Sequence, residues 1–283
     1  TMLLVQPRER SYELLALPAG TPVMPALRHS GEMARSGLQP AVTGTAAVVF
    51  DSTGTRVVTG RGGSSARIWN IPAESAAEVG TGFAYDDARV LAINPVGYQV
   101  VSGNQAGGIS FLDRGQPWSQ AVGEDQTAGH AGAITVLSFS NDGSHLLSVG
   151  ADGSVLLWDA VTRSLAGQRF HHGSGEVSSA AIGPDNRLIA TGGELGARLW
   201  DGITGEPGPV LGPGRQIIDV AISADGSRVA TLSRDTVEFW RADDGELEWS
   251  AQLPGRPARL ALHGNPQKLA VALNDGRVLV WGQ

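Results

Sequence analysis

The sequence predicts an all-β fold built from several copies of one four-stranded antiparallel sheet. Three observations support this prediction: apolar and polar residues alternate with a period near two, turn residues recur about every ten positions, and one segment returns along the chain. With 39 glycines and 15 prolines among 283 residues, turns should be frequent, and 41% hydrophobic residues suffice for a substantial core. A helical repeat is excluded because its apolar residues would recur every three or four positions.

The clearest copy of the repeat is residues 129–159, and weaker copies occupy 45–70, 88–113, 177–201, 217–241 and 258–282. Within a copy, a strand, a turn such as Asn-Asp-Gly, a second strand, an Asp-Gly turn and a third strand precede a more polar fourth segment. The third strand ends near an aromatic position that recurs every 40 to 46 residues: Trp69, Leu112 in place of an aromatic residue, Trp158, Trp200, Trp240 and Trp281. Four strands in about 40–45 residues is the repeat of a β-propeller blade.

Applied to the whole chain, this repeat predicts a single domain, a seven-bladed β-propeller of four-stranded antiparallel blades. The blades are expected at approximately 1–28 (partial), 45–80, 87–122, 129–170, 172–211, 213–253 and 254–283, the last without its outer strand. If Met2–Val5 supplies that outer strand, the ring has seven blades. If Pro22–Arg28 supplies it, six blades close. We favour seven, and we expect the domain to be excised from a longer protein because the chain enters strand-like sequence at once.

Three dipeptides give this repeat a family resemblance. Gly129-His130 and Trp158-Asp159 bracket one copy, Trp200-Asp201 ends the next, and the chain resembles a WD-repeat (WD40) β-propeller of bacterial type. The resemblance implies a hydrogen-bonded polar chain within a blade, which supports the fold and takes no part in catalysis. The matching residues are His130, Ser148, Asp152 and Trp158. The copy ending at Trp200 keeps Thr191 and offers Glu194 in place of the aspartate.

Composition and motifs argue against several functions. The formal charge of −7, without a run of basic residues, argues against nucleic acid or a membrane as partner. The absence of cysteine excludes disulfides and thiolate metal sites. His171 and His172 are the only close histidine pair, but neighbours on a strand point to opposite faces, so we expect no metal and no cofactor. The glycine-rich segment 60–65 lacks the Lys-Ser/Thr of a phosphate-binding loop and is interpreted as a hairpin turn.

These exclusions favour a non-catalytic protein-interaction or sensing scaffold, with no catalytic residue in this domain. We expect it to be a cytoplasmic module of a larger multidomain bacterial signalling or regulatory protein, in which a fused upstream domain could be enzymatic. The bacterial assignment uses residue choice, since Lys268 is the single lysine among 21 basic residues. The alternative is a propeller enzyme with its active site at the channel mouth. The absence of any converging nucleophile, base or metal cluster favours the scaffold.

In propellers of this family, partners often use the face formed by the loops that enter each first strand and by the turns between second and third strands. Five arginines are expected on or near that face: Arg61, Arg215, Arg234, Arg256 and Arg277. Guanidinium groups pair well with carboxylates, so one interpretation is a docking face for an acidic peptide, a protein or another domain of the parent protein. The other interpretation, which we favour, is ordinary turn residues paired with neighbours such as Asp235, Glu194 and Asp275. Trp118 and Trp249, outside the repeat position, are expected to be half-buried packing residues.

Overall fold

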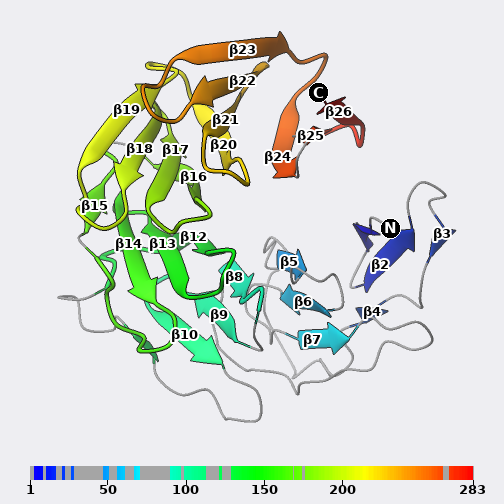
Figure 1. Ribbon diagram of the computed structural model, residues 1–283. Coiled ribbons are helices and arrows are strands. Elements are labelled where there is room, and N and C mark those ends of the chain that lie inside the picture. Colours follow the sequence, from blue (N-terminus) through cyan, green and yellow to red (C-terminus); the bar gives the residue numbers. More distant parts are fainter. Residues whose placement is uncertain are drawn as a thin grey trace.

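In the computed structural model, side chains are described for residues 90–96, 99–111, 129–167, 169–173, 176–262 and 268–282. The strands outside these ranges are described by their backbone alone. Within these described parts, all regular elements are strands. The described residues therefore contain no helix that could span a membrane. Figure 1 shows the strands gathered into separate sheets that follow one another around a central opening.

The described strands form seven antiparallel sheets. The first three sheets contain β1 (Leu3–Arg8), β2 (Ser11–Ala16), β3 (Thr21–Pro22) and β4 (Leu27–Arg28); β5 (Ala47–Phe50), β6 (Arg56–Gly60) and β7 (Arg67–Asn70); and β8 (Val90–Ile93), β9 (Val100–Gly103), β10 (Ile109–Leu112) and β11 (Ala121–Val122). The next two contain β12 (Ile134–Phe139), β13 (His145–Gly150), β14 (Ser154–Asp159) and β15 (Phe170–His171), and β16 (Val177–Ile182), β17 (Leu188–Gly193), β18 (Gly196–Asp201) and β19 (Pro207–Leu211). The last two contain β20 (Ile217–Ile222), β21 (Arg228–Ser233), β22 (Thr236–Arg241) and β23 (Leu247–Gln252), and β24 (Pro257–His263), β25 (Lys268–Leu273) and β26 (Val278–Gly282).

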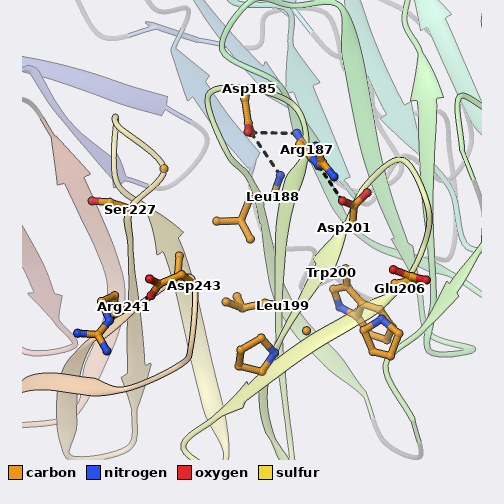
Figure 2. A pocket seen from close by; sticks show the side chains of 15 residues that line it. Asp185, Arg187, Leu188, Leu199, Trp200, Asp201, Glu206, Ser227, Arg241 and Asp243 are labelled. Atoms are coloured by element: carbon orange, nitrogen blue, oxygen red, sulfur yellow. Dashed lines mark hydrogen bonds and ion pairs between the residues drawn. The ribbon is translucent and has the colours of Figure 1, made fainter.

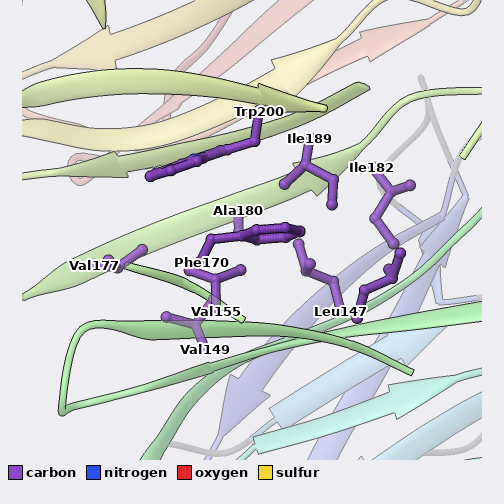
Figure 3. Packing of buried hydrophobic residues seen from close by; sticks show 10 residues of the cluster. Leu147, Val149, Val155, Phe170, Val177, Ala180, Ile182, Ile189 and Trp200 are labelled. Atoms are coloured by element: carbon purple, nitrogen blue, oxygen red, sulfur yellow. The ribbon is translucent and has the colours of Figure 1, made fainter. Parts of the chain in front are cut away.

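Successive sheets are joined through their first strands, which lie nearest the centre of the ring. β5, β8, β12, β16, β20 and β24 contact one another in that order. Between neighbouring sheets the apolar side chains form separate cores. Figure 3 shows the core between the β12–β15 and β16–β19 sheets, where Phe170 stacks on Trp200 with ring centroids 5.7 Å apart. The β12–β15, β16–β19 and β20–β23 sheets are thus buried on both faces, as the near-continuous burial of their middle strands also indicates.

The inner strands share a local irregularity that links them. The strand register shifts after the first residue of β12, β16, β20 and β24, which is typical of a β-bulge. At this bulge, Thr135 donates a hydrogen bond to the carbonyl oxygen of Val177 at 3.4 Å, in the next sheet. Ser178 repeats the contact one sheet on, to the carbonyl oxygen of Ile217 at 2.5 Å. The bulges therefore tie adjacent sheets together at the inner edge.

Asp219 joins three inner strands through one buried carboxylate. Its Oδ1 accepts a hydrogen bond from the Ser179 hydroxyl at 2.6 Å, and its Oδ2 accepts one from the backbone N–H of Leu260 at 3.0 Å. Both side chains are buried, Asp219 at 8% exposure. The carboxylate therefore connects β16, β20 and β24 where the sheets are closest.

The N-terminal strands depart from the closure expected from the sequence. β1 pairs with β2 over its whole length, from Leu3 opposite Ala16 to Arg8 opposite Ser11. Met2–Val5 therefore does not supply the outer strand of the last blade, and Pro22–Arg28 instead contributes the short strands β3 and β4, which also pair with β2. Neither segment pairs with the last blade as expected, because an alternating pattern indicates a strand but does not specify which strand pairs with it. The number of blades in the closed ring stays a prediction.

Replacing Asp219 with alanine should destabilise the fold. The Ser179 hydroxyl and the Leu260 N–H would lose their acceptor in a buried place, which typically costs about 1–3 kcal/mol. Urea denaturation of the purified protein would measure the loss. Asp235→Ala, at an exposed turn residue, is the matched control and should change the free energy of unfolding by less than about 0.5 kcal/mol. Equal effects of the two substitutions would contradict the role of the bridging carboxylate.

Candidate functional site

The most complete polar network lies in the β12–β15 sheet. Trp158 donates its indole N–H to the Ser148 hydroxyl at 2.8 Å, and this hydroxyl lies 2.7 Å from Nε2 of His130. On its other side, Nδ1 of His130 lies 2.7 Å from the Ser154 hydroxyl, which donates to Oδ1 of Asp152 at 2.7 Å. The structure thus brings together all four residues matched by the family resemblance. Ser154, which the sequence did not indicate, stands between the histidine and the aspartate.

The donors and acceptors of this network form one directed chain. Because Trp158 can only donate, the chain is satisfied when Ser148 donates to Nε2 of a neutral His130 and Nδ1 donates to Ser154. Burial lowers the pKa of His130 to about 4, against the opposing effect of Asp152, so the ring is neutral near pH 7. For Asp152, burial acts to raise the pKa, but hydrogen bonds from Ser154 and the backbone of Ala131 outweigh it and hold the pKa at about 2.

The next sheet contains a shorter version of the same chain. The Thr191 hydroxyl accepts the indole N–H of Trp200 at 2.9 Å and lies 2.7 Å from Nδ1 of His172. Burial lowers the pKa of His172 as well, and its ring also bonds the backbone of Gly196. Glu194 does not replace the aspartate, because its side chain is exposed at the turn. Its backbone position matches the repeat, but its longer side chain extends into solvent.

In the β20–β23 sheet, the tryptophan–hydroxyl bond is accompanied by an ion pair and not by a histidine. Trp240 still donates to a buried hydroxyl, that of Thr231, at 2.8 Å. Glu238 lies one strand across, with its side chain 3% exposed, and its Oε1 accepts a hydrogen bond from Nη1 of Arg215 at 2.6 Å. Its other oxygen, Oε2, is buried and has no hydrogen-bond partner among the described residues. Sequence analysis missed Glu238, because a glutamate within an otherwise apolar strand has no counterpart in the other copies.

Four of the predicted face arginines do lie along one edge of two neighbouring sheets. β20 begins opposite the end of β21, which places Arg215 near Arg234. β24 begins opposite the end of β25, which places Arg256 next to the turn that contains Arg277. A backbone hydrogen bond from Leu253 to Asp235 connects the two turn regions. We call these four residues the arginine rim. Arg61 lies outside the described residues.

Two of the four arginines of the arginine rim form ion pairs within the protein. Arg215 binds the buried Glu238, and Arg277 binds Asp275 at 2.8 Å; both guanidinium side chains remain about half exposed. Arg234 and Arg256 are exposed, and in the described parts of the chain their guanidinium groups make no ion pair. The pairing expected of ordinary turn residues is therefore found for Arg215 and Arg277, and a docking role for Arg234 and Arg256 stays a prediction.

The remaining candidate residues have structural contacts. His171 is exposed while His172 binds Thr191, and no group of three potential metal ligands occurs among the residues searched, which are the described ones. Trp249, 38% exposed, packs between Phe239 and Trp281 with ring centroids 5.8 and 5.9 Å away. β6 and β7 pair as a hairpin around segment 60–65, whose own residues, like Trp118, lie outside the described part.

Residues 124–159 and 164–201 match the family model described as WD domain, G-beta repeat. These two segments are WD40 repeats. They include the complete polar chain and its shorter version, and the circular order of antiparallel sheets is that of a WD40 β-propeller. A chain in the crystal structure of the mitotic checkpoint complex superposes with a TM-score of 0.79 at 18% identity, covering 99% of this chain and 84% of that one. That likeness shows the fold alone.

Curated relatives match parts of this chain. "Target of rapamycin complex subunit wat1" of Schizosaccharomyces pombe is 28% identical over 48% of this chain and 44% of its own length. "Protein LST8 homolog" of Drosophila melanogaster is 28% identical over 52% of this chain and 51% of its own. "Telomerase protein component 1" of Mus musculus is 32% identical over 55% of this chain but 6% of its own. The chain thus spans about half of these relatives or less. All three are eukaryotic, so the bacterial assignment gains no support.

Removing the imidazole from the complete polar chain should destabilise the propeller. In His130→Ala, Ser148 and Ser154 both lose a buried partner, so the free energy of unfolding should fall by roughly 1–3 kcal/mol. Thermal and urea denaturation would measure this. His171→Ala, at an exposed neighbour of the shorter chain, is the control and should leave stability nearly unchanged. An unchanged melting midpoint in His130→Ala would refute the role assigned to this network.

Stability should also decline as the pH falls from about 6.5 to about 4. The ordinary pKa of 6.5 applies to His130 in the unfolded chain, whereas burial holds it at about 4 in the fold. In this window the unfolded state binds the additional proton and is favoured, by up to about 3 kcal/mol for this one group. His130→Ala should lose that part of the pH dependence in urea titrations at about pH 7 and pH 5. Asp152 acts in a separate window, below its ordinary value of 3.8.

Proposed function

We propose that this WD40-repeat chain is a non-catalytic protein-interaction scaffold. The observation that carries the proposal is the arginine rim, where Arg234 and Arg256 extend exposed guanidinium groups from turns between well-packed strands. Rigid turns on a sheet framework are well suited to binding, since little order has to be gained when a partner docks. The named relatives agree with protein partners, because one is described as a complex subunit and one solved neighbour as part of a checkpoint complex.

The partner that fits the arginine rim is an acidic peptide or an acidic segment of another domain. Arg234 and Arg256 offer planar donors in two-point geometry to carboxylates. Arg215 and Arg277 are occupied by Glu238 and Asp275, so Arg234 and Arg256 are left to make the direct contacts. Placement of this module in a multidomain bacterial signalling protein in the cytoplasm rests on residue usage alone and stays a prediction.

An enzyme is the less favoured alternative. Among the described histidines, His130 has the largest pKa shift. It is 2% exposed, and both of its ring nitrogens make hydrogen bonds. A general base must reach its substrate, directly or through one water, and this ring does neither. Its lowered pKa is explained by its structural position in the polar chain.

We further propose a closed ring of seven blades, in which the β1–β4 sheet lies beside the β24–β26 sheet. The support is the last sheet's outer face: Val278 and Val280 are 54% and 64% exposed, although both are apolar. The opposite face of the same sheet, with Leu269 and Val271, is fully buried against the preceding blade. An apolar sheet face of this kind is stable when a neighbouring sheet covers it.

The arginine rim can be tested with a fluorescein-labelled peptide of alternating glutamate and alanine. It should bind at low ionic strength and more weakly at physiological salt, because exposed charges are screened over about 8–10 Å. Arg234→Ala/Arg256→Ala should weaken binding about tenfold with little loss of stability. Arg215 is left in place because its removal would leave Glu238 buried and unpaired. Arg187→Ala, which removes an exposed arginine from the opposite edge, is the control and should not alter binding. Unchanged binding by the double variant would overturn the proposal.

A further inference from the structure

A groove opens at the edge opposite the arginine rim, between the β16–β19 and β20–β23 sheets. It encloses about 770 Å³ (Figure 2). One side is formed by the turn before β17, the end of β18 and the start of β19, and the other by the turns before β21 and after β22. All of these elements belong to the described part of the chain, and of the polar-chain residues described above the groove lining includes Trp200.

The floor of the groove is apolar because of the sequence of β19. This outer strand begins Pro207-Gly208-Pro209, and its register against β18 is broken between Arg198 and Trp200. Proline cannot donate a ladder hydrogen bond and glycine has no side chain, so the groove reaches close to Leu199, which is itself 1% exposed. A Cβ atom at Gly208 would lie 3.4 Å from the Cβ of Leu199. Leu188 and the edge of Trp200 complete this floor.

The rim of the groove is acidic. Its charged residues are four carboxylates and two arginines: Asp185, Asp201, Glu206, Asp243, Arg187 and Arg241. Each arginine is already neutralised, since Nε of Arg187 binds Asp201 at 2.7 Å and Arg241 binds Asp243, Asp244 and Glu246. Glu206 is exposed, and within the described structure its carboxylate makes no hydrogen bond or ion pair. Asp243 is 76% exposed and meets Arg241 only at 3.1 Å.

We propose that this groove binds a basic peptide segment in which arginine alternates with leucine. The aliphatic side chains would fill the space above Leu188 and Leu199, while the arginines would pair with Glu206 and Asp243 on opposite sides of the opening. Charge complementarity selects this partner, because an apolar floor alone would accept many sequences, whereas exposed carboxylates favour cationic ones. The groove and the arginine rim lie on opposite edges and prefer partners of opposite charge. This proposal therefore does not depend on the rim.

Three fluorescein-labelled peptides of equal length test the proposal by fluorescence anisotropy with the whole chain. The first alternates arginine and leucine, the second glutamate and leucine, and the third arginine and serine. The first should bind most tightly, and each of the others at least about tenfold more weakly, because each lacks one of the two required properties. Binding of the first should weaken as salt rises.

Two variants locate the binding surface. Glu206→Arg/Asp243→Arg reverses charge at two groove carboxylates that accept no backbone hydrogen bond, and it should weaken binding of the arginine–leucine peptide about tenfold or more. Glu194→Arg makes one such charge reversal at an exposed turn on the opposite edge and should leave binding within about twofold. Circular dichroism and melting curves establish that both variants are folded.

Four outcomes would overturn the proposal. They are equal binding of the three peptides, no binding of the arginine–leucine peptide at millimolar concentration, equal losses in the groove and control variants, and loss of binding in Arg234→Ala/Arg256→Ala. The last would place the peptide at the arginine rim instead. Failure of the rim experiment alone leaves this one intact, since the acidic probe and its variants report on the other edge.

Discussion

The architecture depends on one constraint: a sheet with two apolar faces is stable only between two neighbours. Leu147 and Phe170 cover one face of the β16–β19 sheet, and Val220 and Trp240 cover the other. Repeating this arrangement leads the sheets around a circle, because each new sheet covers the exposed face of the preceding one. The edges, where the turns lie, and exposed outer strands such as β23 remain for contacts with other molecules. The arginine rim is made of turn residues, whereas the groove combines turn residues with a floor formed by strands β17 to β19.

The same constraint explains the polar chains of the three sheets from β12 to β23. The repeat tryptophan fills space between sheets, but its indole N–H must be satisfied where water cannot reach. A hydroxyl on the neighbouring strand meets that need in each case, as Ser148, Thr191 or Thr231. What lies beyond the hydroxyl differs among the sheets. The β12–β15 sheet uses a histidine linked to an aspartate and the next sheet a histidine alone, whereas the β20–β23 sheet contains a separate ion pair of Arg215 and Glu238.

The residues that differ among the sheets are also the ones that the sequence predicted least well. The spacing of the tryptophans and the Asp-Gly turns predicted the sheets and their order because these follow from a local period, whereas the residues of the complete polar chain came from the family resemblance. Ser154 and Glu238 were missed because their partners His130 and Arg215 lie on other segments of the chain, where the repeat contains no signal. The pairing of β1 with β2 was missed for a related reason: alternation shows which face a residue occupies but not which strand lies beside it. Likewise, Arg215 and Arg234 look alike in the sequence, yet only the former has a buried carboxylate within reach.

The charges of the two edges also have different origins. On the groove edge, several aspartates are required by the turns themselves: Asp185 accepts backbone N–H groups from Arg187 and Leu188, and Asp201 accepts those of Ile203 and Thr204. These carboxylates would be present whether or not a partner binds there, so acidity alone is no sign of a site. Glu206 and Asp243 differ, because their side chains accept no backbone hydrogen bond in the described structure. Since the fold does not require them, their charge can be explained by binding. For that reason these two positions, rather than the turn aspartates, distinguish a basic docking groove from an acidic edge produced by turn chemistry.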